Sequence, residues 1–241
     1  GYFMKKLNIL FFIFILISGC TNGEEIIKYE AGIIETRSVE AQTESSSILI
    51  SINRELTMAY EFFLRGDYLR ALRVYKKAIR EYTKFDYLHR AATVYSNIAT
   101  ILQTSNDLAG AEKYINLSNK LGALYIANDI ERLRLNAVNL NRLALINLLK
   151  GNNDKAKENN DKSYKINKNI NNEIGISKNY RINGLYYFLK GNISESIKFI
   201  NNAILINLKY IDYYDLILNR ITLGEINTKE KKYKLALRYY N

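Results

Sequence analysis

The chain has little of several residue types on which common protein chemistry depends. Its 241 residues include one cysteine, one histidine, no proline and no tryptophan. A single thiol excludes an intramolecular disulfide, and one histidine with one cysteine cannot build a zinc site of the usual composition within the chain. No Ser-His-Asp centre stands out, and no glycine-rich phosphate loop is present. The sequence therefore predicts a protein that is not an enzyme and needs no cofactor.

The few acidic and histidine residues that could form a site are interpreted as ordinary surface groups. Asp86 and His89 are three residues apart, so on a helix they would share a face. A metal or acid–base role is one interpretation, but isolated pairs of this kind are usually surface contacts, which we favour. Asp212 and Asp215, one helical turn apart, are interpreted as part of a solvated helix face.

The only cysteine ends a short apolar segment. Two lysines follow Met4, and residues 7–17 are apolar with one interruption. Eleven residues are too few for a membrane span of about 20 residues, but they fit a secretory h-region of about 7–15 residues. The run ends in Ile-Ser-Gly-Cys at positions 17–20, which resembles the lipobox of bacterial lipoproteins. The resemblance implies cleavage after Gly19 and acylation of Cys20; a plain signal peptide or an uncleaved anchor is the alternative.

These features divide the chain into three predicted parts. Residues 1–19 are a signal peptide with its true start at Met4, 20–47 are the lipidated N-terminus and an acidic tether, and 48–241 are the folded domain. After the cysteine, the tether holds six acidic residues against two basic ones. Low hydrophobicity with net negative charge is typical of a segment with little packed structure, although a short helix within it stays open.

The folded part contains an internal repeat. Five turn residues recur at regular intervals: Gly66, Asn106, Gly151, Gly191 and Lys231. A small residue follows each by five positions: Ala71, Ala111, Ala156, Ser196 and Ala236. Both series step by 40, 45, 40 and 40 residues. Small side chains let two antiparallel helices approach closely, and glycine or asparagine tolerates the left-handed conformation that ends many helices.

The helix ends can be placed from capping residues. Asp67 and Asp107 directly follow two of the turns and are predicted to cap the next helix. The longer step of 45 residues requires five extra residues in the third unit. We expect a break near Gly122 and a new helix starting at Asn128, with Glu131 three residues on as in a capping box.

The pattern resembles the tetratricopeptide repeat over about residues 50–241. The first unit matches best, with Ala59, Gly66, Asp67, Tyr68, Ala71, Tyr75 and Ala78. The resemblance implies an all-α, right-handed α-solenoid of about five helical hairpins. The period near 40 departs from the usual period of about 34, and the third unit has Asn160 where an aromatic residue is expected. Since the sequence stops inside its fifth unit, we expect either a continuation or a partner for that unit.

The resemblance also implies a function in protein–protein interaction. In the family, the first helix of each hairpin lines a concave groove that holds a peptide or a partner helix. Counting back from each turn gives the groove candidates Asn53, Tyr60, Ser96, Thr100, Asn141, Lys178 and Arg181. Some family members hold a peptide carboxylate with Asn, Lys and Arg at such positions; an ordinary hydrated groove is the alternative.

The excess of basic residues has three interpretations. The net charge is +11, and the two lysines of the leader and the net −4 of residues 21–47 leave +13 for the repeats. Nucleic acid is a poor partner for an exported lipoprotein. A membrane surface or an anionic envelope polymer fits better, and lysines that merely solvate the surface are the interpretation we favour.

Together these observations predict a lipid-anchored, non-catalytic adaptor of the bacterial cell envelope, periplasmic or on the cell surface. Its partners would be envelope proteins or peptides, and the membrane through acyl chains on Cys20, with no nucleic acid and no metal. A surface lipoprotein that binds a host or environmental ligand is the alternative, and an enzyme of unfamiliar type is a third and weaker one.

Overall fold

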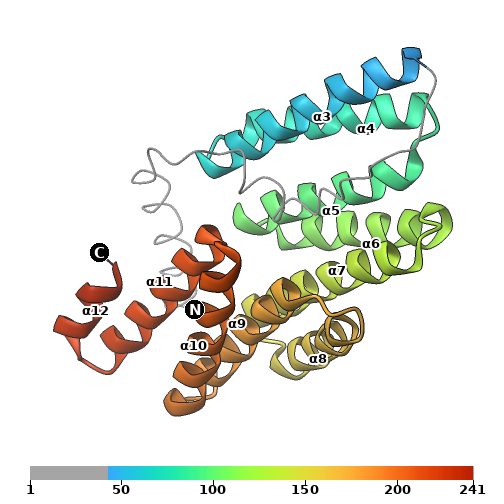
Figure 1. The fold of residues 1–241 in the computed structure, drawn as a ribbon. Helices are drawn as coiled ribbons and strands as arrows, with labels where there is room; N and C mark the ends of the chain where they lie inside the picture. The colour runs from blue at the N-terminus through green and yellow to red at the C-terminus, as the bar shows by residue number, and fades with distance from the viewer. Residues whose placement is uncertain (1–42, 241) are drawn as a thin grey trace. The chain divides into compact units, whose positions relative to one another are not determined.

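The computed structural model describes residues 43–240, and within that range it contains helices and no strand. The helices are α3 (Thr43–Leu64), α4 (Tyr68–Lys84), α5 (Leu88–Thr104), α6 (Leu108–Tyr125), α7 (Asp129–Leu149), α8 (Asn153–Asn169), α9 (Glu173–Leu189), α10 (Ile193–Tyr210), α11 (Tyr213–Lys229) and α12 (Tyr233–Tyr240). The expected all-α fold class is confirmed, because helix follows helix throughout the described residues (Figure 1).

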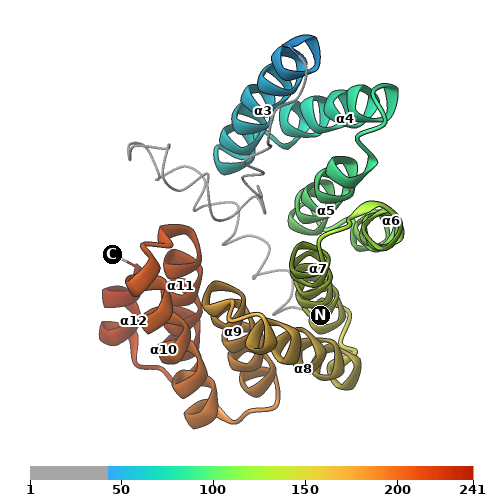
Figure 2. The same ribbon diagram turned by 45° about the vertical axis from the view of Figure 1, so that its right-hand side comes forward.

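The chain divides into two compact units, and the division falls inside α7. Unit 1 extends to Leu135, and unit 2 begins at Asn136. Within each unit, helices adjacent in sequence pack side by side, as α5 does with α6 and α10 with α9 (Figures 1 and 2). Helices one hairpin apart also touch, since α9 contacts α11. This neighbour-to-neighbour packing is the arrangement of a helical solenoid.

The turns between helices follow a shorter period than the sequence indicated. All five predicted turn residues have a left-handed backbone, with φ of 77° at Gly66, 65° at Asn106, 80° at Gly151 and Gly191, and 59° at Lys231. Three more turn residues share it: Asp86, Asn171 and Ile211. These lie 20 residues after a predicted turn, so the unit of repetition is one helix with its turn. We missed Asp86 and Ile211 because Asp and Ile are less typical of this conformation than Gly. We missed Asn171 because it lies between two members of the series of predicted turns.

All of these turns except the one at Ile211 close with the same pair of hydrogen bonds. At the first turn, the Gly66 N–H donates to the Phe63 carbonyl at 2.9 Å, and the Asp67 N–H donates to the Phe62 carbonyl at 2.8 Å. This Schellman pattern satisfies carbonyls that would otherwise be unpaired at the helix end. At the two turns where a cap was predicted, the next residue caps the following helix: Asp67 accepts from the Arg70 N–H at 3.1 Å and Asp107 from the Gly110 N–H at 2.8 Å.

The extra residues of the third unit lie mainly in α7. The chain breaks between α6 and α7, and Asn128 accepts a hydrogen bond from the Glu131 N–H at 3.0 Å, which confirms the predicted start. However, α7 has 21 residues where the first helices α5, α9 and α11 each have 17. Gly122 lies within α6 rather than at the break, and a Cβ there would lie 2.9 Å from Leu135 Cδ2. This glycine therefore serves close helix packing.

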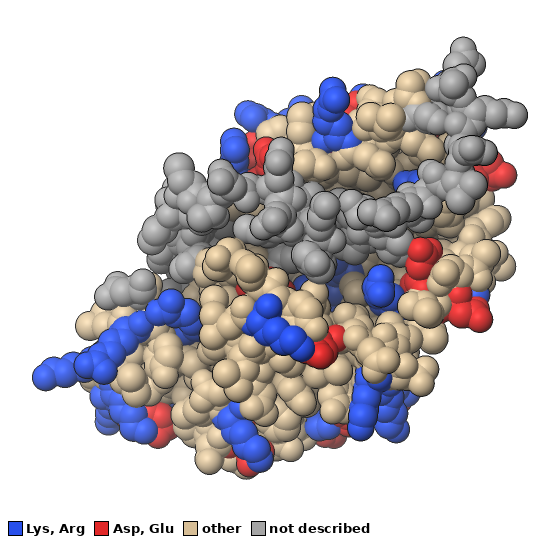
Figure 3. All heavy atoms as spheres, viewed as in Figure 1, with Lys and Arg blue, Asp and Glu red and all other residues tan. Residues whose placement is uncertain are grey.

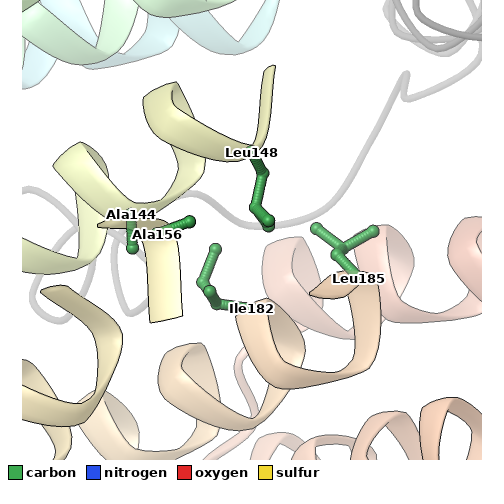
Figure 4. Close-up of a cluster of buried hydrophobic side chains, with 5 residues drawn as sticks. All are labelled: Ala144, Leu148, Ala156, Ile182 and Leu185. Carbon is green, nitrogen blue, oxygen red and sulfur yellow. The ribbon is translucent and has the colours of Figure 1, made fainter. Parts of the chain in front are cut away.

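The repeated small residues lie at helix contacts, as the sequence predicted. Ala71, Ala111, Ala156, Ser196 and Ala236 are all buried. Figure 4 shows one such contact, in which Ala156 of α8 lies with Ala144 and Leu148 of α7 and with Ile182 and Leu185 of α9. A larger side chain at this point would push the three helices apart.

The N-terminal predictions fall mostly outside the described residues. The predicted signal peptide, the acylated Cys20 and most of the acidic tether belong to residues 1–42. Helix α3 begins at Thr43, inside the segment assigned to the tether, where a short helix was left open. No described helix is both long enough and apolar enough to cross a bilayer.

Candidate functional site: the first helices of the hairpins

In unit 1, the predicted groove residues divide between surface and interior. Asn53 of α3 is exposed, and its side-chain oxygen accepts a hydrogen bond from the Tyr82 hydroxyl at 3.5 Å. Tyr60 and Ser96 are buried. Thr100 of α5 is half-buried, and its hydroxyl donates to the Ser96 carbonyl at 3.4 Å. Only Asn53 and part of Thr100 therefore present polar groups that a ligand could reach.

In unit 2, two predicted groove residues meet a carboxylate of the chain itself. Lys178 and Arg181 of α9 face Asp215 of α11, at 3.0 Å from Lys178 Nζ to Asp215 Oδ2 and 3.8 Å from Arg181 Nε to Asp215 Oδ1. The sequence predicted these cations as holders of a peptide carboxylate. In the structure they hold Asp215, and the cluster keeps one net positive charge.

The interpretation of Asp212 and Asp215 as a solvated face is wrong, because both are buried. Asp212 caps α11: its Oδ1 accepts from the Asp215 N–H at 3.1 Å, and its Oδ2 accepts from Asn207 Nδ2 at 3.3 Å. Burial by itself raises the pKa of Asp215, but Lys178 and then Arg181 outweigh it, so the pKa lies below its ordinary value. Asp215 is therefore a buried, ionised partner for α9.

A network of buried asparagines holds α7, α8 and α9 together. Asn160, fully buried in α8, donates to the Asn183 side-chain oxygen and the Asn179 carbonyl, both at 3.0 Å. Its own side-chain oxygen accepts from Asn179 at 2.9 Å and from the predicted groove residue Asn141 at 3.4 Å. Asn141 is buried as part of this network. Asn160, which stands where the tetratricopeptide pattern expects an aromatic residue, is thus the centre of the network.

The asparagine pattern repeats one hairpin later. Asn167 donates to the side chain of Asn179 at 2.8 Å, and 40 residues on Asn219 donates to the side chain of Asn207 at 2.8 Å. A signal for this network exists in the sequence, since asparagine recurs at 139, 179 and 219 and at 167 and 207. We missed it because asparagine is usually interpreted as a surface or turn residue.

Glu225 of α11 is an unusual buried carboxyl group. Its side chain is 8% exposed, and burial raises its pKa to about 7. The residue 40 positions earlier is Leu185, which packs in the cluster of Figure 4. Within residues 43–240 no ion pair involving Glu225 is found. Burial of a carboxyl group at a repeat position that is otherwise apolar lowers the stability of the fold, and burial of the ionised carboxylate lowers it further.

The Asp86–His89 pair does not form a site. Asp86 lies in the turn before α5 with φ of 59°, so the two residues do not share a helix face as we expected. The ring of His89 meets that of Tyr87 edge-on at 6.2 Å. Burial, then the charge of Arg90, lowers the pKa of His89. In the described part of the chain, no group of three or more His, Cys, Asp or Glu residues could hold a metal ion.

Comparison with known proteins shows likeness at the level of fold. No protein-family model matches the chain, and no curated protein matches its sequence. The apo form of RapI is similar in structure, with a TM-score of 0.55 and 18% identity, over 78% of this chain and 67% of that one. BtubC (BKLC) from P. vanneervenii is similar with a TM-score of 0.58 and 16% identity, over 81% of this chain and 79% of that one. The chain is thus an all-α helical-repeat protein.

Proposed function

We propose that this protein is a lipid-anchored, non-catalytic scaffold of the bacterial cell envelope that binds a partner protein or peptide along the first helices of its hairpins. The single observation that carries the proposal is the regular alternation of first and second helices in both units. Repetition of this kind produces an extended binding surface. The likeness in fold to RapI and BtubC supports the helical-repeat scaffold and does not identify a partner.

The lipid anchor is the part of the proposal that rests on sequence. A positive segment, a short apolar run and a lipobox-like sequence lie in register ahead of the sole cysteine. Two or more acyl chains give stable membrane attachment, whereas one gives marginal binding. Anchoring would place the helical repeats beside a membrane, where they could gather a second protein.

The binding surface is tested by site-specific photo-crosslinking of the full-length chain in a bacterial host. A photoreactive residue replaces Asn53 of α3 in one variant and Lys178 of α9 in another. Matched controls carry it at exposed positions of second helices, Arg73 of α4 and Lys198 of α10. Crosslinked products are identified by mass spectrometry.

We expect a crosslinked partner at each first-helix position, taken unit by unit, and none at the control position of the same unit. Equal crosslinking at all four positions would contradict a first-helix binding surface. Cys20→Ala tests the anchor separately: high salt should release the variant from the membrane fraction, whereas the acylated wild type should stay bound. A tagged chain that external protease cleaves on whole cells, with no partner captured, would instead favour a surface protein with a ligand outside the cell.

A further inference from the structure

One helix end in unit 2 exposes apolar side chains that the repeat does not require. The last turns of α10 and the start of α11 carry Leu205, Leu208, Ile211 and Tyr213, which we name the apolar tip. Their side chains are 66%, 56%, 57% and 48% exposed. Residues three apart in a helix are neighbours on its surface, so Leu205 and Leu208 lie side by side, and Ile211 follows directly after the end of α10.

The same positions in the preceding hairpin are polar. Forty residues earlier, at the end of α8, stand Lys165, Lys168 and Asn171, which are also exposed. The fold therefore accepts polar residues at these places and does not require the apolar ones at the end of α10. Clustered exposed apolar side chains mark contact surfaces in many proteins.

Ile211 adds an independent observation. Its backbone is left-handed, with φ of 57° and ψ of 35°, at the position where Asn171 and Asp86 stand in other turns. A β-branched residue in this conformation is strained, whereas asparagine adopts it readily. Ile211 is thus both strained and exposed, which indicates a role for its side chain outside the folded core.

The charge of unit 2 identifies the kind of surface that the apolar tip fits. Residues 136–241 contain 18 basic and 9 acidic residues, a net charge of +9, whereas the rest of the chain carries only +2. Figure 3 shows basic side chains spread over the face in view, with fewer acidic ones among them. A cationic body attracts a membrane that contains anionic lipid, and leucine, isoleucine and tyrosine are residues that enter the headgroup region.

We propose that the apolar tip inserts into the interfacial region of a bilayer containing anionic lipid, guided by the positive charge of unit 2. Tyr213 has a polar hydroxyl on an apolar ring, and Lys209, beside the tip, has a charged end on an apolar stem, so both suit the boundary between lipid and water. Lys209 also pairs with Glu173 of α9 at 2.7 Å, which ties the end of α10 to its neighbour. The proposal depends on the surface of unit 2 and not on acylation of Cys20.

The single native cysteine permits a direct test in the full chain. In a Cys20→Ser background, Leu208→Cys carries an environment-sensitive fluorophore, and the matched control carries it at Leu124, a similarly exposed leucine of α6 in unit 1. The probe is vesicles of phosphatidylglycerol and phosphatidylcholine in equal parts, with a nitroxide quencher on the lipid. We expect a blue shift and lipid quenching at position 208 and neither at position 124.

One further variant, with two added substitutions, separates a surface role from a structural one. Adding Ile211→Asn and Leu205→Asn should reduce quenching at position 208, while thermal stability holds or rises because asparagine relieves the left-handed strain. Vesicles of phosphatidylcholine alone should give weaker quenching. Equal quenching at 208 and 124, or undiminished quenching in the asparagine variant, would overturn the proposal. A blue shift without vesicles that grows with protein concentration would also overturn it, in favour of a contact between copies of the chain.

Discussion

The two units fill the same repeat position with opposite chemistry. In unit 1, Tyr82 of α4 and Val94 of α5 are buried near the turn that joins these two helices. In unit 2, the residues in the same register are Asn167 of α8 and Asn179 of α9, which are equally buried and bonded to each other at 2.8 Å. The helices nevertheless pack in the same way, with a small residue at each contact.

The comparison shows what the repeat geometry demands at this position. At this position the side chain must fill the space between the helices, and any buried polar group must have a hydrogen-bond partner. The side chain need not be apolar. Apolar packing tolerates exchange among side chains of similar volume. A buried amide network tolerates little exchange, because removing one member leaves its partners without hydrogen bonds. Unit 2 should therefore respond more sharply than unit 1 to single substitutions.

The largest effect is expected for Asn160→Leu in unit 2. The change removes the hydrogen bonds that join Asn160 to Asn141, Asn179 and Asn183. Since each buried amide left unpaired costs about 1–3 kcal/mol, we expect a loss of about 3 kcal/mol in the free energy of unfolding. Urea denaturation measures the loss, and hydrogen exchange should locate it in α8 and α9.

The control for this prediction is Ile115→Leu in unit 1. Ile115 of α6 occupies the same repeat position and is fully buried. A volume-conserving apolar exchange usually costs less than about 1.5 kcal/mol. If the two substitutions destabilise the protein equally, the proposed contrast between the units does not hold.

The next largest effect concerns the buried carboxyl of Glu225. Its pKa of about 7 in the folded state, against 4.5 for an ordinary glutamate, means that folding favours the protonated form. The contribution of the protonated Glu225 carboxyl to the free energy of unfolding is fully present below about pH 4.5. This contribution is lost as the pH rises to about 7. The difference between the two pKa values corresponds to at most about 3 kcal/mol, and water that reaches the incompletely buried carboxyl reduces this value. We therefore expect Glu225→Gln to gain about 2 kcal/mol over the wild type above pH 7, measured by denaturation across the pH range.

The gain should vanish at acidic pH, where wild-type Glu225 is protonated as well. Glu195→Gln on α10 is the matched control, because that carboxylate is partly exposed and faces Lys198. A constant difference between Glu225→Gln and wild type from pH 4 to pH 8 would rule out the assigned ionisation.

A smaller loss is expected for Asp215→Asn, which breaks the ion cluster of α9 and α11. Removing one partner of a fully buried pair costs about 3–5 kcal/mol, but the Lys178 side chain is 27% exposed and Arg181 13%. Water therefore compensates in part, and we expect about 1.5 kcal/mol. Because the pKa of Asp215 is lowered, the contribution is present above pH 4 and is lost as pH falls further. A loss unchanged down to pH 2 would contradict the ion cluster.

The sequence predicted the helices and most of the turns of the fold, but it predicted few of the contacts between buried polar side chains. The turn and small-residue series predicted the helix pairs, because left-handed turns and close helix contacts restrict which residues they accept. The asparagine network was not predicted, since one amide in a sequence does not reveal whether it meets a partner from another helix. Asp215 was misplaced for the same reason: its two cations lie 34 and 37 residues earlier in the chain.

The predicted groove shows the same limit. Lys178 and Arg181 were predicted as groove residues of one first helix, but their contact with Asp215 depends on how α11 packs on α9. Tyr60 and Ser96 were counted as groove residues from their distance to a turn. A helical period of 20 residues differs from the spacing usual in tetratricopeptide repeats, so that count does not fix which face a side chain occupies.

The smallest effects should be alike in the two units, because both use the same helix caps. Asp107 accepts from the Gly110 N–H in unit 1, and Asn192 accepts from the Glu195 N–H at 3.2 Å in unit 2. Removing an N-cap side chain costs about 1 kcal/mol, so Asp107→Ala and Asn192→Ala should each lower the free energy of unfolding by about that amount. Denaturation of both variants at neutral pH provides the measurement. If Asn192→Ala destabilises the protein several times more than Asp107→Ala, the helices of unit 2 depend on their capped ends as well as on the amide network. The difference between the two units would then be a property of the whole of unit 2 and not of its buried asparagines alone.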